Sequence, residues 1–140
     1  MIWGKARLML FWVRRLIDMQ DLHIKRQRVS GVEVVEMTGA VDALAFTKLS
    51  TTLAHLVEET APCIVLECSR VTYIGSAQLK ELIGFAHTAQ SRGGDLKCVG
   101  LPQTIRQVAK LVAMGNLMEF HDFLPQAMQA FHGSPAAAAV

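Results

Sequence analysis

The stretch TYIGSAQLKEL, residues 72–82, places Ser76 where a strand-like run gives way to a helical spacing of leucines. A serine hydroxyl at the start of a helix can accept a hydrogen bond from a free backbone N–H, which stabilises the helix by about 1 kcal/mol. The same position can carry a phosphate, because free N–H groups and the helix dipole favour an anion there. We predict Ser76 at the N-cap of this helix, and both interpretations stay open.

The other residues that carry chemistry in enzymes form no catalytic or metal-binding pattern. SRGGDL at 91–96 fits neither nucleotide-binding loop, and Ser76 lacks the G-x-S-x-G elbow. No H-E-x-x-H or C-x-x-C occurs, and the histidines are scattered. The cysteines lie inside apolar runs, as buried reduced thiols do, at Cys63, Cys68 and Cys98. We therefore expect no enzyme, no catalytic residue, no metal and no cofactor.

The apolar pattern predicts one α/β domain that positions this serine. Residues 22–29 and 32–39 alternate apolar and polar side chains around a Ser-Gly turn, which predicts a β-hairpin. Short apolar runs predict three further strands, at 63–68, 95–100 and 117–123. Apolar spacings of three and four predict four helices, over 46–57, 79–86, 105–112 and 124–131. The order implies a mixed sheet of about five strands with right-handed crossovers, flanked by these four helices.

Residues 1–21 predict a basic amphipathic helix in front of this domain. Such a helix can dock on a protein or on another copy of the chain, and residues 1–18 can also contact an anionic membrane surface. A third interpretation is that residues 1–18 form an upstream extension and that Met19 is the native start. No stretch reaches the roughly 18 apolar residues of a spanning helix. We expect the compact domain over 22–132 and a flexible tail over 133–140.

Three segments resemble the STAS domain family, the anti-sigma factor antagonists and their relatives. MTGAVDALAFTKL is similar to the family's G-x-[LV]-D segment, with Asp42 at its acidic position. CIVLECSRVTYIGSAQLKEL is similar to the buried strand and I-D-S-[ST]-G-L turn of the family, with Ser76 at its phosphorylated serine. RGGDLKCVGLPQTIRQVAKLVAMGNLMEF is similar to the later strand and helix. The chain departs from the turn pattern in having Gly75 for the aspartate, Ala77 for the second hydroxyl residue and Gln78 for the glycine.

The resemblance implies a STAS-like sheet with helices mainly on one face, and a non-catalytic regulatory module of bacterial signal transduction and transcription regulation. It implies a cytoplasmic protein that binds an anti-sigma factor, a serine kinase-like protein or another signalling protein. Phosphorylation of Ser76 would control this contact. The implied partner-binding residues are Asp42, Gly75, Ser76, Ala77, Gln78 and Leu79.

Two alternatives use the same fold differently. The first is a scaffold or assembly subunit of a stressosome-like or membrane-transport complex, without phosphorylation. The missing aspartate and the basic N-terminal segment favour it, and homo-oligomers or peripheral contact with the inner face of the membrane would fit it. The second is a small-molecule binder for a nucleotide or lipid, which rests on the helix N-terminus alone. The formal net charge of +2 is too small to indicate nucleic-acid binding.

Overall fold

The computed structural model describes residues 2–20, 22–111 and 118–132. Helix α1 (Ile2–Gln20) precedes a hairpin of β1 (His23–Val29) and β2 (Val32–Val41). Helices and strands then alternate, as α2 (Ala43–Leu56), β3 (Cys63–Ile74), α3 (Ser76–Ser91), β4 (Asp95–Val99), α4 (Gln103–Leu111), β5 (Phe120–His121) and α5 (Leu124–His132). This order confirms the predicted α/β architecture of a five-stranded mixed sheet with an additional N-terminal helix.

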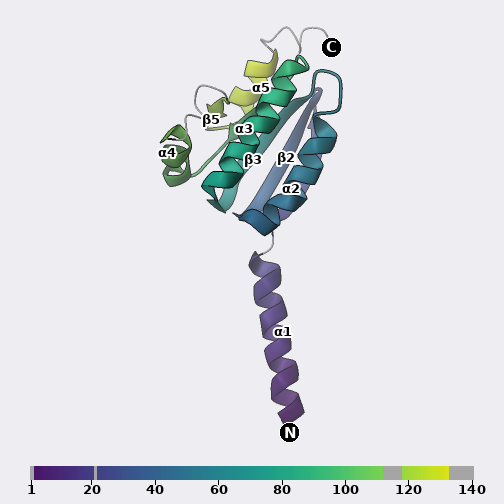
Figure 1. Cartoon of the computed structure of the whole chain (residues 1–140), viewed down its shortest axis with the longest axis vertical. Coiled ribbons are helices and arrows are strands. Elements are labelled where there is room, and N and C mark those ends of the chain that lie inside the picture. The colour runs from purple at the N-terminus through teal and green to yellow at the C-terminus, as the bar shows by residue number, and fades with distance from the viewer. Residues whose placement is uncertain (1, 21, 112–117, 133–140) are drawn as a thin grey trace.

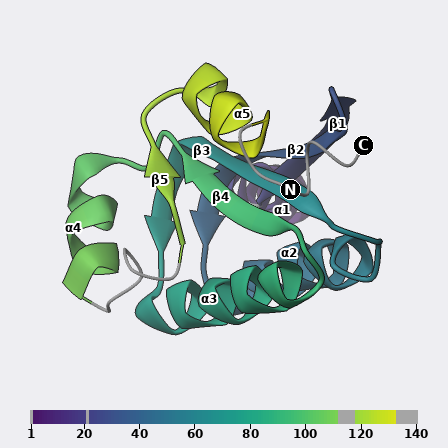
Figure 2. The same cartoon turned by 90° about the horizontal axis from the view of Figure 1, so that it is seen from above.

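The sheet has the strand order β1-β2-β3-β4-β5. β1 is antiparallel to β2, and the remaining neighbours are parallel. The hairpin turns at Ser30 and Gly31, whose φ angles of 50° and 79° match the twist of the two strands. Helices α2 and α3 cover one face and α5 lies on the other, while α4 stands beyond the β5 edge (Figures 1 and 2).

The core has two parts because helices cover both faces of the sheet. On the α2 and α3 face, residues such as Leu49 and Leu82 pack with Val35 and Leu66. On the α5 face, a smaller cluster joins Val32, Val65, Val99, Ala127 and Phe131. Val34 and Val35 are therefore both fully buried, although a half-buried strand would bury only one of them.

β5 covers only Phe120–His121 of the strand predicted at 117–123, and β3 and α4 also differ from their predictions. β3 continues to Ile74 instead of ending at 68, because it stays paired with β2 as far as the Val41–Ile74 register. In α4, Ala109 is buried but Val108 is 44% exposed, although both were predicted to face the core. A helix beyond the edge strand has less sheet to cover, which explains the exposed valine. Val112, at the end of the predicted helix, lies outside the described residues.

Helix α1 extends away from the domain (Figure 1). Its residues Leu8–Val13 are all exposed. Within the described part of the chain, no helix combines the length and apolar character needed to cross a membrane. Just after α1 the chain is fixed to the domain, because Leu22 is buried and its carbonyl oxygen accepts a hydrogen bond from Lys48 Nζ at 3.1 Å.

Candidate functional site

The ends of β2 and β3 and the first turns of α2 and α3 meet at one end of the domain. Val41 and Ile74 are neighbours in the parallel register. The backbone N–H of Gly75 donates to the carbonyl oxygen of Val41 at 3.3 Å. The 39–42 and 75–79 segments, which the sequence motifs single out, therefore lie side by side. α1 leaves the domain at this same end, next to the start of α2 (Figure 1).

Asp42 caps α2. Its backbone is extended, at φ −90° and ψ −177°, and its Oδ1 accepts a hydrogen bond from the Ala45 backbone N–H at 2.8 Å. The side chain thus satisfies a backbone donor that the first helical turn leaves free. Asp42 is also exposed, so the capping carboxylate stands on the surface of this end.

Ser76 is not the N-cap that was predicted. β3 ends at Ile74, so Gly75 occupies the N-cap, with φ −71° and ψ 150°, and no side chain caps the helix. Gly75 also does not use the positive φ that a glycine would allow here. Ser76 is the first residue of α3, and it is exposed. Its hydroxyl lies at the positive end of a helix of 16 residues, where an attached phosphate would meet the helix dipole.

Gln78 fills the space beside Gly75. A Cβ atom at position 75 would lie 2.0 Å from Oε1 of Gln78, 3.2 Å from its Cδ and 3.5 Å from the hydroxyl oxygen of Tyr73. Gln78 is only 9% exposed. Glycine is therefore favoured at 75 by the volume of a neighbouring side chain and not by its backbone angles. The two departures from the expected turn pattern, at 75 and 78, belong together.

Exposed apolar side chains also occur at this end of the domain. Leu44 in the first turn of α2 is 82% exposed, and Tyr73 near the end of β3 is 54% exposed. Exposed apolar residues of this kind can take part in a protein contact. Sequence reasoning missed both of them. The signal for Tyr73 was its place before the inward Ile74, which turns it outward, and Leu44 lies two residues after the capping Asp42.

The remaining predicted contact residues separate into surface and core. Ala77 is exposed beside Ser76. Leu79 is 1% exposed and belongs to the core cluster, so its side chain packs in the core beneath the turn and does not reach the surface. A partner would therefore meet Asp42, Leu44, Tyr73, Ser76 and Ala77, which we call the loop surface.

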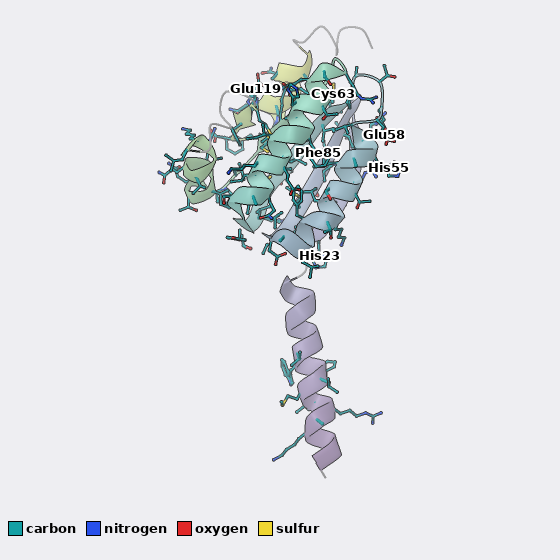
Figure 3. All side chains as sticks on the ribbon, in the orientation of Figure 1. His23, His55, Glu58, Cys63, Phe85 and Glu119 are labelled. Carbon is teal, nitrogen blue, oxygen red and sulfur yellow. The ribbon has the colours of Figure 1, made fainter. Side chains whose placement is uncertain are left out.

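An open groove of about 460 Å³ runs between α2 and α3. It is lined by Ser50, Thr51, Ala54, His55, Glu58 and Phe85. Figure 3 labels three of these residues, His55, Glu58 and Phe85, on the two helices. The groove lies between the same two helices whose N-terminal ends carry Asp42 and Ser76.

A buried lysine connects β4 to β5 and α5. Lys97 is 4% exposed, and its ammonium donates to Asp95 Oδ2 at 2.9 Å and to the carboxylate of Glu119. It also lies 4.8 Å from the ring centroid of Phe131. Burial lowers the pKa of Lys97, but the hydrogen bonds to Glu119 and Asp95 outweigh it, and the pKa is raised. The same contact with Lys97 lowers the pKa of Glu119. With its charge satisfied, this lysine has a structural role.

The three cysteines are free thiols in this structure, and the predicted burial holds for two of them. Cys68 and Cys98 are buried, and Cys63 is partly buried. Burial raises the pKa of the Cys63 thiol, which keeps it protonated. Among the described residues, no group of three or more histidine, cysteine, aspartate or glutamate side chains is placed to hold a metal ion.

The fold and a match to a family model identify a STAS domain. The family model described as "Mlab, STAS domain" matches residues 24–124, and the chain belongs to this family. No curated protein sequence matches the chain significantly.

Three solved structures show the same fold. An anti-sigma factor antagonist from Mycobacterium paratuberculosis has a TM-score of 0.73 at 21% identity, covering 81% of this chain and 96% of that one. A STAS domain protein from Planctomyces limnophilus has a TM-score of 0.68 at 13% identity, covering 79% and 98%. The Bacillus cell fate determinant SpoIIAA, in its phosphorylated form, has a TM-score of 0.60 at 14% identity, covering 77% and 98%.

Proposed function

We propose that this chain is a non-catalytic regulatory module that binds a protein partner through the loop surface, and that phosphorylation of Ser76 weakens the contact. The observation that carries the proposal is the exposed Ser76 at the first position of α3, at the end of the domain that also carries the exposed Leu44 and Tyr73. The partner class is an anti-sigma factor, a serine kinase-like protein or another signalling protein. An anti-sigma factor antagonist among the structures of the same fold supports this class.

The physical basis of the switch is a difference between the free and the bound module. In the free module, a phosphate on Ser76 is solvated and lies at the favourable end of the α3 dipole. It brings about −1.5 to −2 charges. A partner packed against Leu44 and Tyr73 would enclose that anion, and an enclosed charge without a counter-ion costs several kcal/mol. Binding is then lost while the fold persists. SpoIIAA, whose structure is known in a phosphorylated form, supports the idea that this fold accepts the modification.

The test is a pull-down with a serine kinase or anti-sigma factor from the same genome as bait. Ser76→Ala is expected to bind as the unmodified chain does, and Ser76→Asp to bind at least tenfold more weakly, as an anion enclosed without a counter-ion would. Thr104→Asp is the matched control, because Thr104 is also an exposed hydroxyl residue in the first turn of a helix, α4. If Ser76→Asp binds as tightly as Ser76→Ala, the switch at this position is wrong.

The second candidate is an assembly subunit that binds constitutively in a stressosome-like or membrane-transport complex. The sequence of the turn favours it. Gly75 stands before Ser76 where the family pattern has an aspartate, and Gln78 fills the space beside Gly75. A kinase that recognises that aspartate would find no negative charge here. The two candidates differ in native mass and modification. A stable complex from native cells in which phosphopeptide mapping finds Ser76 unmodified supports assembly, and a phosphorylated Ser76 supports the switch.

A further inference from the structure

We propose that α1 binds an anionic phospholipid surface and lies in the plane of that surface. The proposal begins with an apolar run that the fold leaves uncovered. Leu8, Met9, Leu10, Phe11, Trp12 and Val13 are 61%, 68%, 69%, 58%, 55% and 46% exposed. Six consecutive exposed apolar residues form a continuous apolar surface, whereas scattered single ones are normal on a protein surface. An apolar occupant would remove this surface from water.

The charges around the run identify that occupant. Lys5 and Arg7 precede it, Arg14 and Arg15 follow it, and the first acidic residue of the chain is Asp18. Of the 14 basic and 12 acidic residues of the chain, four and two lie in residues 1–21, so residues 22–140 carry equal numbers of each. The positive charge is therefore concentrated beside the apolar run. An apolar layer beneath anionic headgroups matches both properties at once.

A second copy of the helix would cover the apolar run but would not match the positive charges beside it. The basic residues stand at both ends of the apolar run. Pairing two copies in parallel places like charges against like, and pairing them antiparallel does the same. No acidic residue before Asp18 can compensate this repulsion. Anionic lipid supplies the opposite charge along the whole length of the helix.

The helix lies on the surface and does not cross it. The charges at positions 14 and 15 interrupt its apolar sequence, and no helix of the described residues meets the requirement for a span. In α1, Met9 and Val13 fall on the side of the helix away from Arg7. Buried tryptophan and basic residues at headgroup level are the usual features of such interfacial helices.

Lipid binding by α1 would also hold the loop surface close to the membrane. The chain is fixed to the domain at Leu22 by Lys48, in the second turn of α2, and α1 leaves from the end at which Asp42 and Ser76 lie. A partner of the loop surface would then be met beside the membrane, a consequence that rests on the function proposed above. The lipid contact itself does not rest on that function, because the vesicles in the test contain no protein partner.

The experiment is flotation of the full chain with vesicles of phosphatidylcholine alone or with added phosphatidylglycerol. Binding is expected only with phosphatidylglycerol and is expected to fall as salt is raised. The chain has two tryptophans, Trp3 and Trp12, and both lie in α1, so a shift of the emission maximum to shorter wavelength reports burial of this helix alone.

Variants in α1 separate its charge from its apolar side. Each Lys or Arg beside an anionic surface strengthens binding about fivefold, so Arg14→Gln/Arg15→Gln is expected to weaken it about 25-fold. Met9→Gln/Val13→Gln is expected to weaken it at least tenfold and to remove the emission shift. Circular dichroism of each variant shows that the domain is folded.

Matched control pairs lie on the domain. Lys25→Gln/Lys110→Gln removes the same charge, and Val108→Gln/Leu111→Gln replaces apolar residues that are 44% and 86% exposed on α4. Both pairs are expected to bind vesicles as the unchanged chain does. The proposal is overturned if the chain does not float with phosphatidylglycerol, or if the α1 variants float as well as the controls. A lipid-free dimer that Met9→Gln/Val13→Gln dissociates, without vesicle binding by the unchanged chain, would identify a second copy as the occupant instead.

Discussion

Gly75 and Gln78 are expected to act as one unit, because a methyl group at 75 would lie 2.0 Å from Oε1 of Gln78. Gly75→Ala therefore forces the carboxamide out of a position in which Gln78 is 9% exposed. Adding a carbon to occupied space costs about 1–3 kcal/mol, and the lower half of that range applies because the displaced atom ends a flexible side chain. Alanine is also a poorer N-cap than glycine, which lowers the free energy of unfolding further.

A double-mutant cycle separates these two effects. In the Gln78→Ala background the clash is gone and only the capping cost of Gly75→Ala remains. The free energies of unfolding from urea denaturation should then give a coupling energy of about 1–2 kcal/mol between the two positions. Equal m-values across the four proteins would show that the unfolded state has not changed.

Gly84→Ala is the control for this cycle. Gly84 lies within the same helix, and a Cβ there would have nothing within 4 Å. This substitution is expected to raise the free energy of unfolding by about 0.5–1 kcal/mol, since alanine favours a helix interior. Effects at 75 and 78 that add within about 0.5 kcal/mol would refute the conclusion that Gln78 occupies the space at Gly75.

Two further predictions concern the surroundings of the site and the far end of the sheet. Asp42→Ala removes the hydrogen bond to Ala45 N–H and should lower the free energy of unfolding by about 1 kcal/mol in urea, while Asp42→Asn should retain most of it. Lys97 lowers the pKa of Glu119, so this contribution to stability is present above the ordinary pKa of 4.5 and is lost as pH falls through the lowered value. As the pH is lowered, the melting temperature should therefore fall less for Glu119→Gln than for the unchanged chain. An equal fall would contradict the contribution of the Lys97–Glu119 contact.

Periodicity was sufficient to predict the fold because both faces of the sheet need apolar residues. The Ser30–Gly31 turn and the alternation on either side of it predicted the hairpin. Apolar spacings of three and four predicted the helices that cover the sheet. The extent of β3 was missed for a different reason. Beyond 68 the continuous apolar run is broken by Ser69, Arg70 and Thr72, and pairing with β2 up to Val41 keeps this stretch in the strand. Strand pairing is a tertiary effect, which a local pattern does not contain.

The candidate site shows the same limit at the scale of one residue. Ser76 was placed correctly at the junction of strand and helix, but the cap moved to Gly75 once β3 reached Ile74. Cap positions depend on the backbone angles of single residues, and sequence patterns locate helix ends only within one or two residues. The contact of Gln78 with Gly75 depends on a side-chain direction in the first turn of α3, which no spacing rule predicts.

The exchange at 75 and 78 separates shape from charge in this turn. The STAS pattern that this chain resembles has an acidic side chain before the serine and none at the later glycine. Here Gln78 supplies a side chain that reaches back to the space beside Gly75. The turn therefore keeps a side chain in this space but loses the negative charge. A partner that recognises the form of the loop surface through Leu44 and Tyr73 would be little affected by this exchange. An enzyme that recognises an acidic residue next to Ser76 would lose a charge-assisted contact, which is worth about 1.5–3 kcal/mol.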